Sequence, residues 1–157
     1  MADFEPTAPQ PGDIVEYDAR TIWAFVLIIA AALAYKYVPR WRAQSPFVEP
    51  AELKNRLDAG DDVVILDVRT AGEFAGKGGH LPGAVNLPFG DLKARLQARD
   101  ADLSPLKCHP VYVHCAMELR GARAARVLRD AGFTDVSVLN GGYRAWRRKG
   151  LPLEGRG

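Results

Sequence analysis

The fold of this chain is decided by residues 111–120, which read VYVHCAMELR. An unbroken apolar run like the one that opens this stretch is typical of a strand buried on both faces of a parallel sheet. The residues that follow Cys115 favour a helix, and Gly132 supplies a terminator for it. We therefore predict a strand over residues 111–113, a turn at Cys115 and a helix over residues 119–131.

Segments of the same two kinds alternate on either side of this stretch. Apolar runs predict strands over residues 47–48, 63–67, 84–87 and 136–139, and helical spacing predicts helices over residues 50–57, 91–96 and 143–149. Strands that alternate with helices imply right-handed crossovers between parallel strands. The sequence thus predicts an α/β fold over residues 50–153, with a doubly wound, mostly parallel sheet.

A separate apolar segment precedes this domain. Residues 21–35 carry no charge, and an extension to Val38 adds only Lys36. As a helix, residues 21–38 would be about 27 Å long, which is short but sufficient to cross a bilayer core. We predict a transmembrane helix there, between an acidic tail over residues 1–20 and a linker over residues 39–49.

The charges that flank this segment predict its orientation. Lys36, Arg40 and Arg42 lie on the C-terminal side, against Arg20 alone on the N-terminal side. The positive-inside rule then places the protein in the cell membrane as a single-pass protein, with the N-terminus outside and the domain in the cytoplasm. A cleaved signal peptide and a buried or interfacial helix are the alternatives. The acidic residues before the segment disfavour a signal peptide, which needs a positive start.

Composition narrows the functional classes. The chain is 48% hydrophobic and 25% charged, as globular proteins are, and its net charge of +2 is too small to indicate nucleic acid binding.

Only two cysteines occur, Cys108 and Cys115. If the segment between them is extended, they lie about 23 Å apart, too far for a disulfide. We expect free thiols in a reducing compartment, and no metal, since the neighbouring histidines do not complete a zinc spacing.

Cys115 occupies the position best suited to chemistry. A loop between a strand end and a helix start directs backbone N–H groups toward one point and adds the positive end of the helix dipole. Both effects favour a thiolate, which is the nucleophilic form of cysteine. The alternative is a small buried residue of the core. Asp67 also follows a predicted strand, and ligands of such sheets bind at the carboxyl ends of the strands.

Three groups of residues in this order resemble the rhodanese family: residues 66–74 (LDVRTAGEF) with 79–88 (GHLPGAVNLP), then the loop 115–120, then residues 139–146 (LNGGYRAW). The resemblance implies a sulfurtransferase. The Cys115 thiolate would take sulfur from a sulfane donor such as thiosulfate, become a persulfide, and pass the sulfur to a thiophilic acceptor, either a small thiol or a protein. No cofactor is implied.

The resemblance also assigns roles within the site. The residues expected to bind substrate around Cys115 are Ala116, Met117, Glu118, Leu119 and Arg120. Arg120 would bind the anionic donor, while Asp67 and Arg69 would brace the neighbouring loop as a charge-assisted pair. The alternative for Asp67, Arg69 and Glu73 is a structural turn and helix cap.

Glu118 departs from the small or cationic residues common in such loops. A carboxylate there would repel an anionic donor by about 1–4 kcal/mol. A catalytically weak, membrane-tethered binding or regulatory module, with a membrane protein as partner, is therefore the second hypothesis. The third is a phosphatase of related fold, although phosphatase loops place their arginine one residue later, where this chain has Gly121. Arginines at three-residue intervals after Arg120 fit a solvated helix face or docking onto anionic headgroups.

Overall fold

The computed structural model describes residues 18–98 and 103–155, without the side chains of residues 39, 40 and 42. The chain forms two compact units, residues 1–35 and residues 36–157. The predicted acidic tail lies outside the described residues as far as residue 17.

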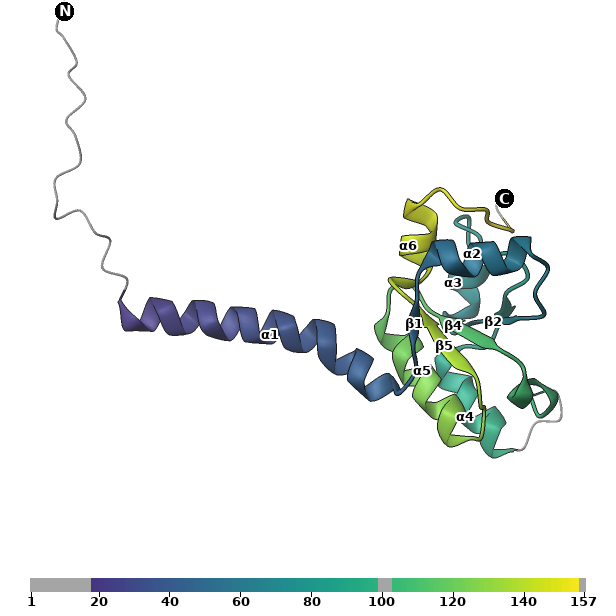
Figure 1. Cartoon of the computed structure of the whole chain (residues 1–157), viewed down its shortest axis with the longest axis horizontal. Coiled ribbons are helices and arrows are strands. Elements are labelled where there is room, and N and C mark those ends of the chain that lie inside the picture. The colour runs from purple at the N-terminus through teal and green to yellow at the C-terminus, as the bar shows by residue number, and fades with distance from the viewer. Residues whose placement is uncertain (1–17, 99–102, 156–157) are drawn as a thin grey trace, which may run out of the picture. The chain divides into compact units, whose positions relative to one another are not determined.

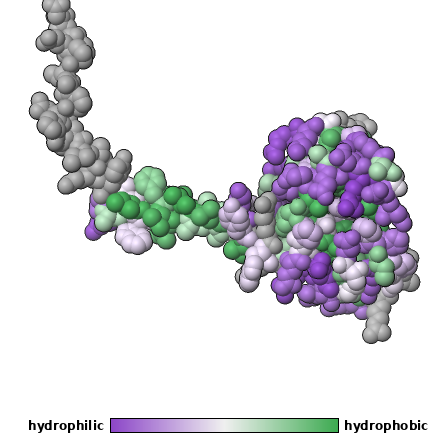
Figure 2. All heavy atoms as spheres, in the orientation of Figure 1, coloured by the Kyte–Doolittle hydropathy of each residue, from purple (hydrophilic) through white to green (hydrophobic). Residues whose placement is uncertain are grey.

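The described N-terminal region is one helix, α1 (Ala19–Ala43). Its stretch Ala19–Val38 has 20 residues and a mean hydropathy of 1.8, so it is long and apolar enough to cross a membrane. None of this stretch is buried against the rest of the described chain. The helix continues into the region that we predicted as a linker. Pro39 lies within it, and because proline has no N–H, the carbonyl of Tyr35 loses its helical hydrogen bond there. Figure 2 shows the apolar character of α1 and the mostly hydrophilic surface of the domain.

The second unit contains a sheet of five parallel strands in the order β1-β5-β4-β2-β3 (Figure 1). The strands are β1 (Phe47–Val48), β2 (Val64–Asp67), β3 (Val85–Asn86), β4 (Val111–His114) and β5 (Val136–Leu139). This order and direction confirm the predicted α/β fold. The central strand β4 is buried along its whole length, as its apolar run predicted.

The helices of this unit are α2 (Pro50–Asp58), α3 (Ala71–Ala75), α4 (Phe89–Gln97), α5 (Leu119–Asp130) and α6 (Gly142–Arg148), with a 3-10 helix η1 (Pro105–Cys108). Helices α4 and α5 cover one face of the sheet, where Leu92 and Leu128 share a core with Val113. Helices α2 and α6 cover the other, where Leu53 and Trp146 pack with Tyr112. These two layers fix the positions of the loops at the strand ends.

Two short elements were not predicted. Helix α3 has only 5 residues, too few to show a helical period, and it begins with a capping box in which Thr70 and Glu73 satisfy each other's backbone N–H. The 3-10 helix begins at Pro105 and ends at Cys108, and the next residue, His109, already has an extended backbone. Cys108 is exposed, Cys115 is buried and both are free thiols.

Candidate active site

The candidate site lies where β2 and β4 end side by side. Asp67, the last residue of β2, is in register with His114, the last residue of β4. Successive residues of a strand point to opposite faces, so His114 and Cys115 diverge. His114 faces Asp67, whereas Cys115 packs into the core on the α4 and α5 side. The end of β4 therefore separates two environments.

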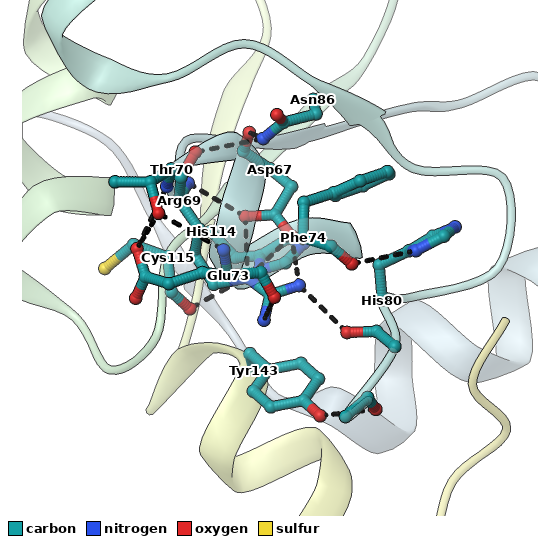
Figure 3. A network of polar contacts seen from close by, with 12 residues as sticks. Asp67, Arg69, Thr70, Glu73, Phe74, His80, Asn86, His114, Cys115 and Tyr143 are labelled. Carbon is teal, nitrogen blue, oxygen red and sulfur yellow. Dashed lines mark hydrogen bonds and ion pairs between the residues drawn. The ribbon is translucent and has the colours of Figure 1, made fainter. Parts of the chain in front are cut away.

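The first environment is a buried cluster around Asp67 and Arg69. The Asp67 carboxylate is fully buried and accepts a hydrogen bond from Arg69 Nε, with Nε–Oδ2 at 2.8 Å. Arg69 Nη2 forms an ion pair with the same oxygen at 2.7 Å. The guanidinium also donates to the carbonyls of Glu73 at 3.0 Å and Gly79 at 3.1 Å, and it lies 4.1 Å from the centre of the Tyr143 ring. Figure 3 shows these contacts converging on Arg69. A buried ion pair with two further bonds to backbone carbonyls braces the loops after β2.

His114 completes this cluster. Its Nε2 lies 3.7 Å from Asp67 Oδ2, and its Nδ1 lies 3.4 Å from the Cys115 carbonyl oxygen. Burial lowers the pKa of His114, an effect that the Asp67 carboxylate opposes. Because a carbonyl only accepts, the neutral ring donates from Nδ1, and within the described residues Nε2 has no hydrogen-bond partner. The ring is a neutral spacer on the face opposite the Cys115 side chain.

The second environment is the loop that begins at Cys115. The Cys115 residue is 3% exposed, while Met117 at 46% and Leu119 at 39% lie at the surface. The first N–H groups of α5 have no partners within the helix, and in the described part of the chain the amides of Ala116 and Met117 have no backbone acceptor. Figure 3 shows the Cys115 sulfur pointing away from Arg69. Unpaired amides beside a helix start suit an anion at this loop.

Arg120 closes the loop and is held by Glu73. Its Nη1 and Nη2 each lie 2.8 Å from a Glu73 carboxylate oxygen, a bidentate pair between α5 and α3. The bond to Arg120 holds the pKa of Glu73 at about 2, and the same bond raises the pKa of Arg120, with a further contribution from Cys115. The Glu73 carboxylate also accepts from the Thr70 N–H at 2.9 Å. The loop after β2 thus holds the arginine of the loop after β4.

The start of α6 is hydrogen-bonded to the backbone of the loop that begins at Cys115. The Tyr143 N–H donates to the Cys115 carbonyl at 2.8 Å, and the Arg144 N–H donates to the Ala116 carbonyl at 3.0 Å. Gly142 has φ +56°, and a Cβ at this position would come within 2.1 Å of the Met117 carbonyl oxygen. Only glycine fits here. This close approach fixes the backbone of the loop.

The predicted site residues thus divide between two places. Residues 115–120 form one continuous loop, and the expected ion pair of Asp67 and Arg69 is present, but on the other side of β4. The helix cap expected as the alternative role of Glu73 is present, but its bond to Arg120 was not predicted. Sequence reasoning also missed the contributions of His114 and Gly142 to the site. The Thr70 and Glu73 capping box was readable as a Thr-x-x-Glu pattern, whereas the partner of Glu73 was not.

Comparison with known proteins agrees with this geometry. Residues 49–149 match the family model of the rhodanese-like domain. The chain belongs to the rhodanese family. The uncharacterised protein YqhL of Bacillus subtilis is 39% identical to this chain over 124 residues, which are 79% of this chain and 92% of YqhL. The human thiosulfate:glutathione sulfurtransferase is 31% identical over 115 residues, which are 68% of this chain and 97% of the relative.

Solved structures show the same rhodanese-like fold. A Rhodopseudomonas palustris protein of unknown function, described as a possible tyrosine phosphatase, superposes with a TM-score of 0.66 at 28% identity, covering 76% of this chain and 92% of that protein. One relative is thus named for sulfur transfer, and one similar structure is described as a possible tyrosine phosphatase. The choice between these chemistries rests on the loop itself.

Proposed function

We propose that this protein is a sulfurtransferase that carries sulfane sulfur as a persulfide on Cys115. The observation that carries the proposal is the loop 115–120, in which a cysteine at the end of β4 is followed by unpaired amides and closed by Arg120. These groups suit an anion on or beside the sulfur. The similarity to the human thiosulfate:glutathione sulfurtransferase supports sulfur, rather than phosphate, as the group transferred.

The proposed reaction has two displacements. In the first, the Cys115 thiolate attacks the outer sulfur of thiosulfate, the S–S bond breaks with its electron pair on the sulfite, and Cys115 becomes a persulfide anion. In the second, an acceptor thiolate attacks the terminal sulfur of the persulfide, and the electron pair returns to Cys115. No electron is gained or lost overall, and no cofactor takes part. The loop amides would stabilise the persulfide anion in between.

Arg120 would bind the anionic donor with the edge of its guanidinium that Glu73 leaves open. The bidentate pair holds the plane of Arg120 in one orientation, which limits the entropy lost when a donor binds. Asp67 and Arg69 would act at a distance, since their cluster holds the backbone of the loop through Glu73 and His114. They are positioning residues in this proposal.

We also propose that residues 21–38 anchor the protein in the cell membrane, with the domain in the cytoplasm. The exposed apolar side chains of α1 support an anchor, because a helix of this length leaves a large apolar surface in water. Extraction of membranes with alkaline carbonate tests it. The intact chain should stay with the membrane, whereas a mature protein that begins near Tyr35 would identify a cleaved signal sequence instead.

A tethered binding module with little catalysis is the second candidate. Two observations favour it: the low exposure of Cys115, at 3%, and the presence of Glu118 in the loop. A membrane protein would be the partner. In this case Cys115→Ser would leave the biological role intact and would leave recovery of the partner from membranes unchanged.

Cyanolysis separates the candidates. The full chain in detergent is mixed with thiosulfate and cyanide, and thiocyanate is measured. We expect turnover by the wild type, none above background by Cys115→Ser, and normal turnover by Cys108→Ser, which removes the exposed thiol as a control. Equal turnover by Cys115→Ser would refute sulfur transfer at this site. Hydrolysis of an aryl phosphate that depends on Cys115 would support phosphatase chemistry instead.

A further inference from the structure

A groove of about 370 Å³ lies beside the candidate site and is not used by the proposed reaction. It lies in the unit 36–157, between Val38, the start of α4 and one face of α5. Its apolar lining comes from Val38, Phe89, Leu119 and Val127. Leu119 is also part of the loop 115–120, so an occupant of the groove would touch the loop that begins at Cys115.

Two arginines line the same groove. Arg123 and Arg126 are exposed and lie one turn apart on α5. Arg126 Nε is 3.5 Å from Asp130 Oδ2, a surface pair that solvent weakens, and Arg123 has no carboxylate partner among the described residues. The groove therefore combines an apolar floor with two guanidinium groups, which together suit an amphipathic anion.

The chain itself indicates where this groove lies. Val38 is the last residue of the stretch Ala19–Val38 that is apolar enough to cross a membrane, and it also lines the groove. A residue at the end of a membrane span lies at the level of the lipid headgroups. Phosphate groups are the anions at that level, and acyl chains begin directly below them. The two arginines match the charge of a lipid phosphate, and Val38 lies at the level where that phosphate would be.

We propose that this groove binds an anionic phospholipid of the inner leaflet, with the phosphate between Arg123 and Arg126 and the upper acyl chain on the apolar lining. The inference rests on the proposed membrane anchor. Bound in this way, α5 holds the loop 115–120 against the membrane surface. The acceptor of the sulfur would then be a thiol at that surface.

Photolabelling tests this inference with the full chain in nanodiscs of phosphatidylcholine and phosphatidylglycerol. One sample contains a photoreactive phosphatidylglycerol and a parallel sample a photoreactive phosphatidylcholine, and fragment mass spectrometry locates the labels. We expect phosphatidylglycerol to label residues 119–127 several-fold more than phosphatidylcholine does. Each cation at an anionic surface changes partition by about fivefold, so Arg123→Gln with Arg126→Gln should lower this labelling by up to about 25-fold.

A matched control is Arg147→Gln with Arg148→Gln, which removes two exposed arginines from α6 on the opposite face of the sheet. This variant should keep the phosphatidylglycerol labels on residues 119–127. Equal labelling by the two lipids, or an equal loss in both double variants, would overturn the groove as a lipid site. Labels on residues 21–38 without labels on residues 119–127 would overturn the groove but not the anchor. An unlabelled span would overturn both.

Discussion

The two sides of the carboxyl end of β4 differ in that one holds a buried pair of opposite charges, whereas the other holds backbone amides without backbone acceptors. On the His114 side, the Asp67 carboxylate and the Arg69 guanidinium are buried and bonded to each other, and the guanidinium also donates to two backbone carbonyls. On the Cys115 side, the loop has exposed side chains at Met117 and Leu119 and amides that bond to no backbone carbonyl of the described residues. One residue step along the strand separates a closed environment from an open one.

This difference shows how the fold divides support from chemistry. Buried and satisfied polar groups resist movement, because any shift leaves a charge without its partner. Unpaired amides around a thiol can accept an anion without first breaking bonds to the protein. Glu73 joins the two sides, since its backbone carbonyl bonds to Arg69 and its carboxylate bonds to Arg120. The closed side should therefore set stability, and the open side should set reactivity.

The largest expected effect comes from breaking the closed side. Asp67→Asn leaves the Arg69 guanidinium buried without a countercharge, which should lower the free energy of unfolding by about 3–5 kcal/mol. Denaturant unfolding of the detergent-solubilised chain measures this. The control is Asp58→Asn, which removes the partner of Lys54 from an exposed pair on α2 and should cost about 0.5 kcal/mol or less. Equal effects of the two variants would contradict the distinction between the sides.

The next effect concerns the backbone that holds the open side. Gly142→Ala places a methyl group against the Met117 carbonyl and should displace the loop, lowering kcat/KM for cyanolysis by about 100-fold. Gly60→Ala is the matched control, because Gly60 also has a positive φ, +74°, but a Cβ added there would meet nothing within 4 Å. That variant should lose about 1 kcal/mol of stability and keep its activity. Unchanged turnover in Gly142→Ala would show that the loop tolerates the shift.

A smaller, pH-dependent effect comes from the link between the sides. The pKa of Glu73 is about 2 in the folded protein against an ordinary value of 4.5, so its pairing stabilises the fold above pH 4.5 and is lost as the pH falls toward 2. Because both side chains are about one-third exposed, we expect only about 1 kcal/mol. Glu73→Gln should therefore be about 1 kcal/mol less stable than the wild type at pH 7 and equally stable near pH 2. Denaturant unfolding at the two pH values measures this.

Glu52→Gln serves as its control, since it removes the same charge from the exposed first turn of α2. Its stability relative to the wild type should change little between these two pH values. A difference between Glu73→Gln and the wild type that stays constant with pH would show that Glu73 acts through helix capping rather than through its charge.

The smallest effect tests the charge on the open side. Glu118→Gln removes a carboxylate from the loop and should raise kcat/KM for thiosulfate by about fivefold at low salt, as expected for one charge seen mostly through water. The gain should shrink at high salt, where the repulsion is screened. Initial rates of thiocyanate formation measure both. No gain at low salt would show that the Glu118 charge does not face the donor.

The sequence predicted where the two sides of β4 lie, but not the contacts that join them. Apolar runs located β2, β4 and β5, and therefore the strand ends where Asp67 and Cys115 lie, because a buried strand needs apolar side chains on both faces. The short α3 escaped prediction because 5 residues show no period. The bond of Arg120 to Glu73 joins residues 47 positions apart, and local patterns do not report which distant loops meet.

Gly142 and His114 illustrate the same limit. A Gly141-Gly142 pair after a strand indicates a turn, but the carbonyl that excludes a side chain belongs to the loop after a different strand. His114 directly follows the apolar run 111–113, and its contact with Asp67 depends on the register between β2 and β4. Register follows from the packing of the whole sheet rather than from either strand alone.

The central claim is that the open side of β4 carries sulfur on Cys115. The most direct measurement is a mass spectrum of the full chain, treated with thiosulfate without reductant and digested to locate adducts. We predict a gain of about 32 Da on the peptide that contains Cys115, which is removed by cyanide, and no gain on Cys108. An unmodified Cys115 after treatment with thiosulfate and other sulfane donors, or an equal adduct on the exposed Cys108, would contradict the account.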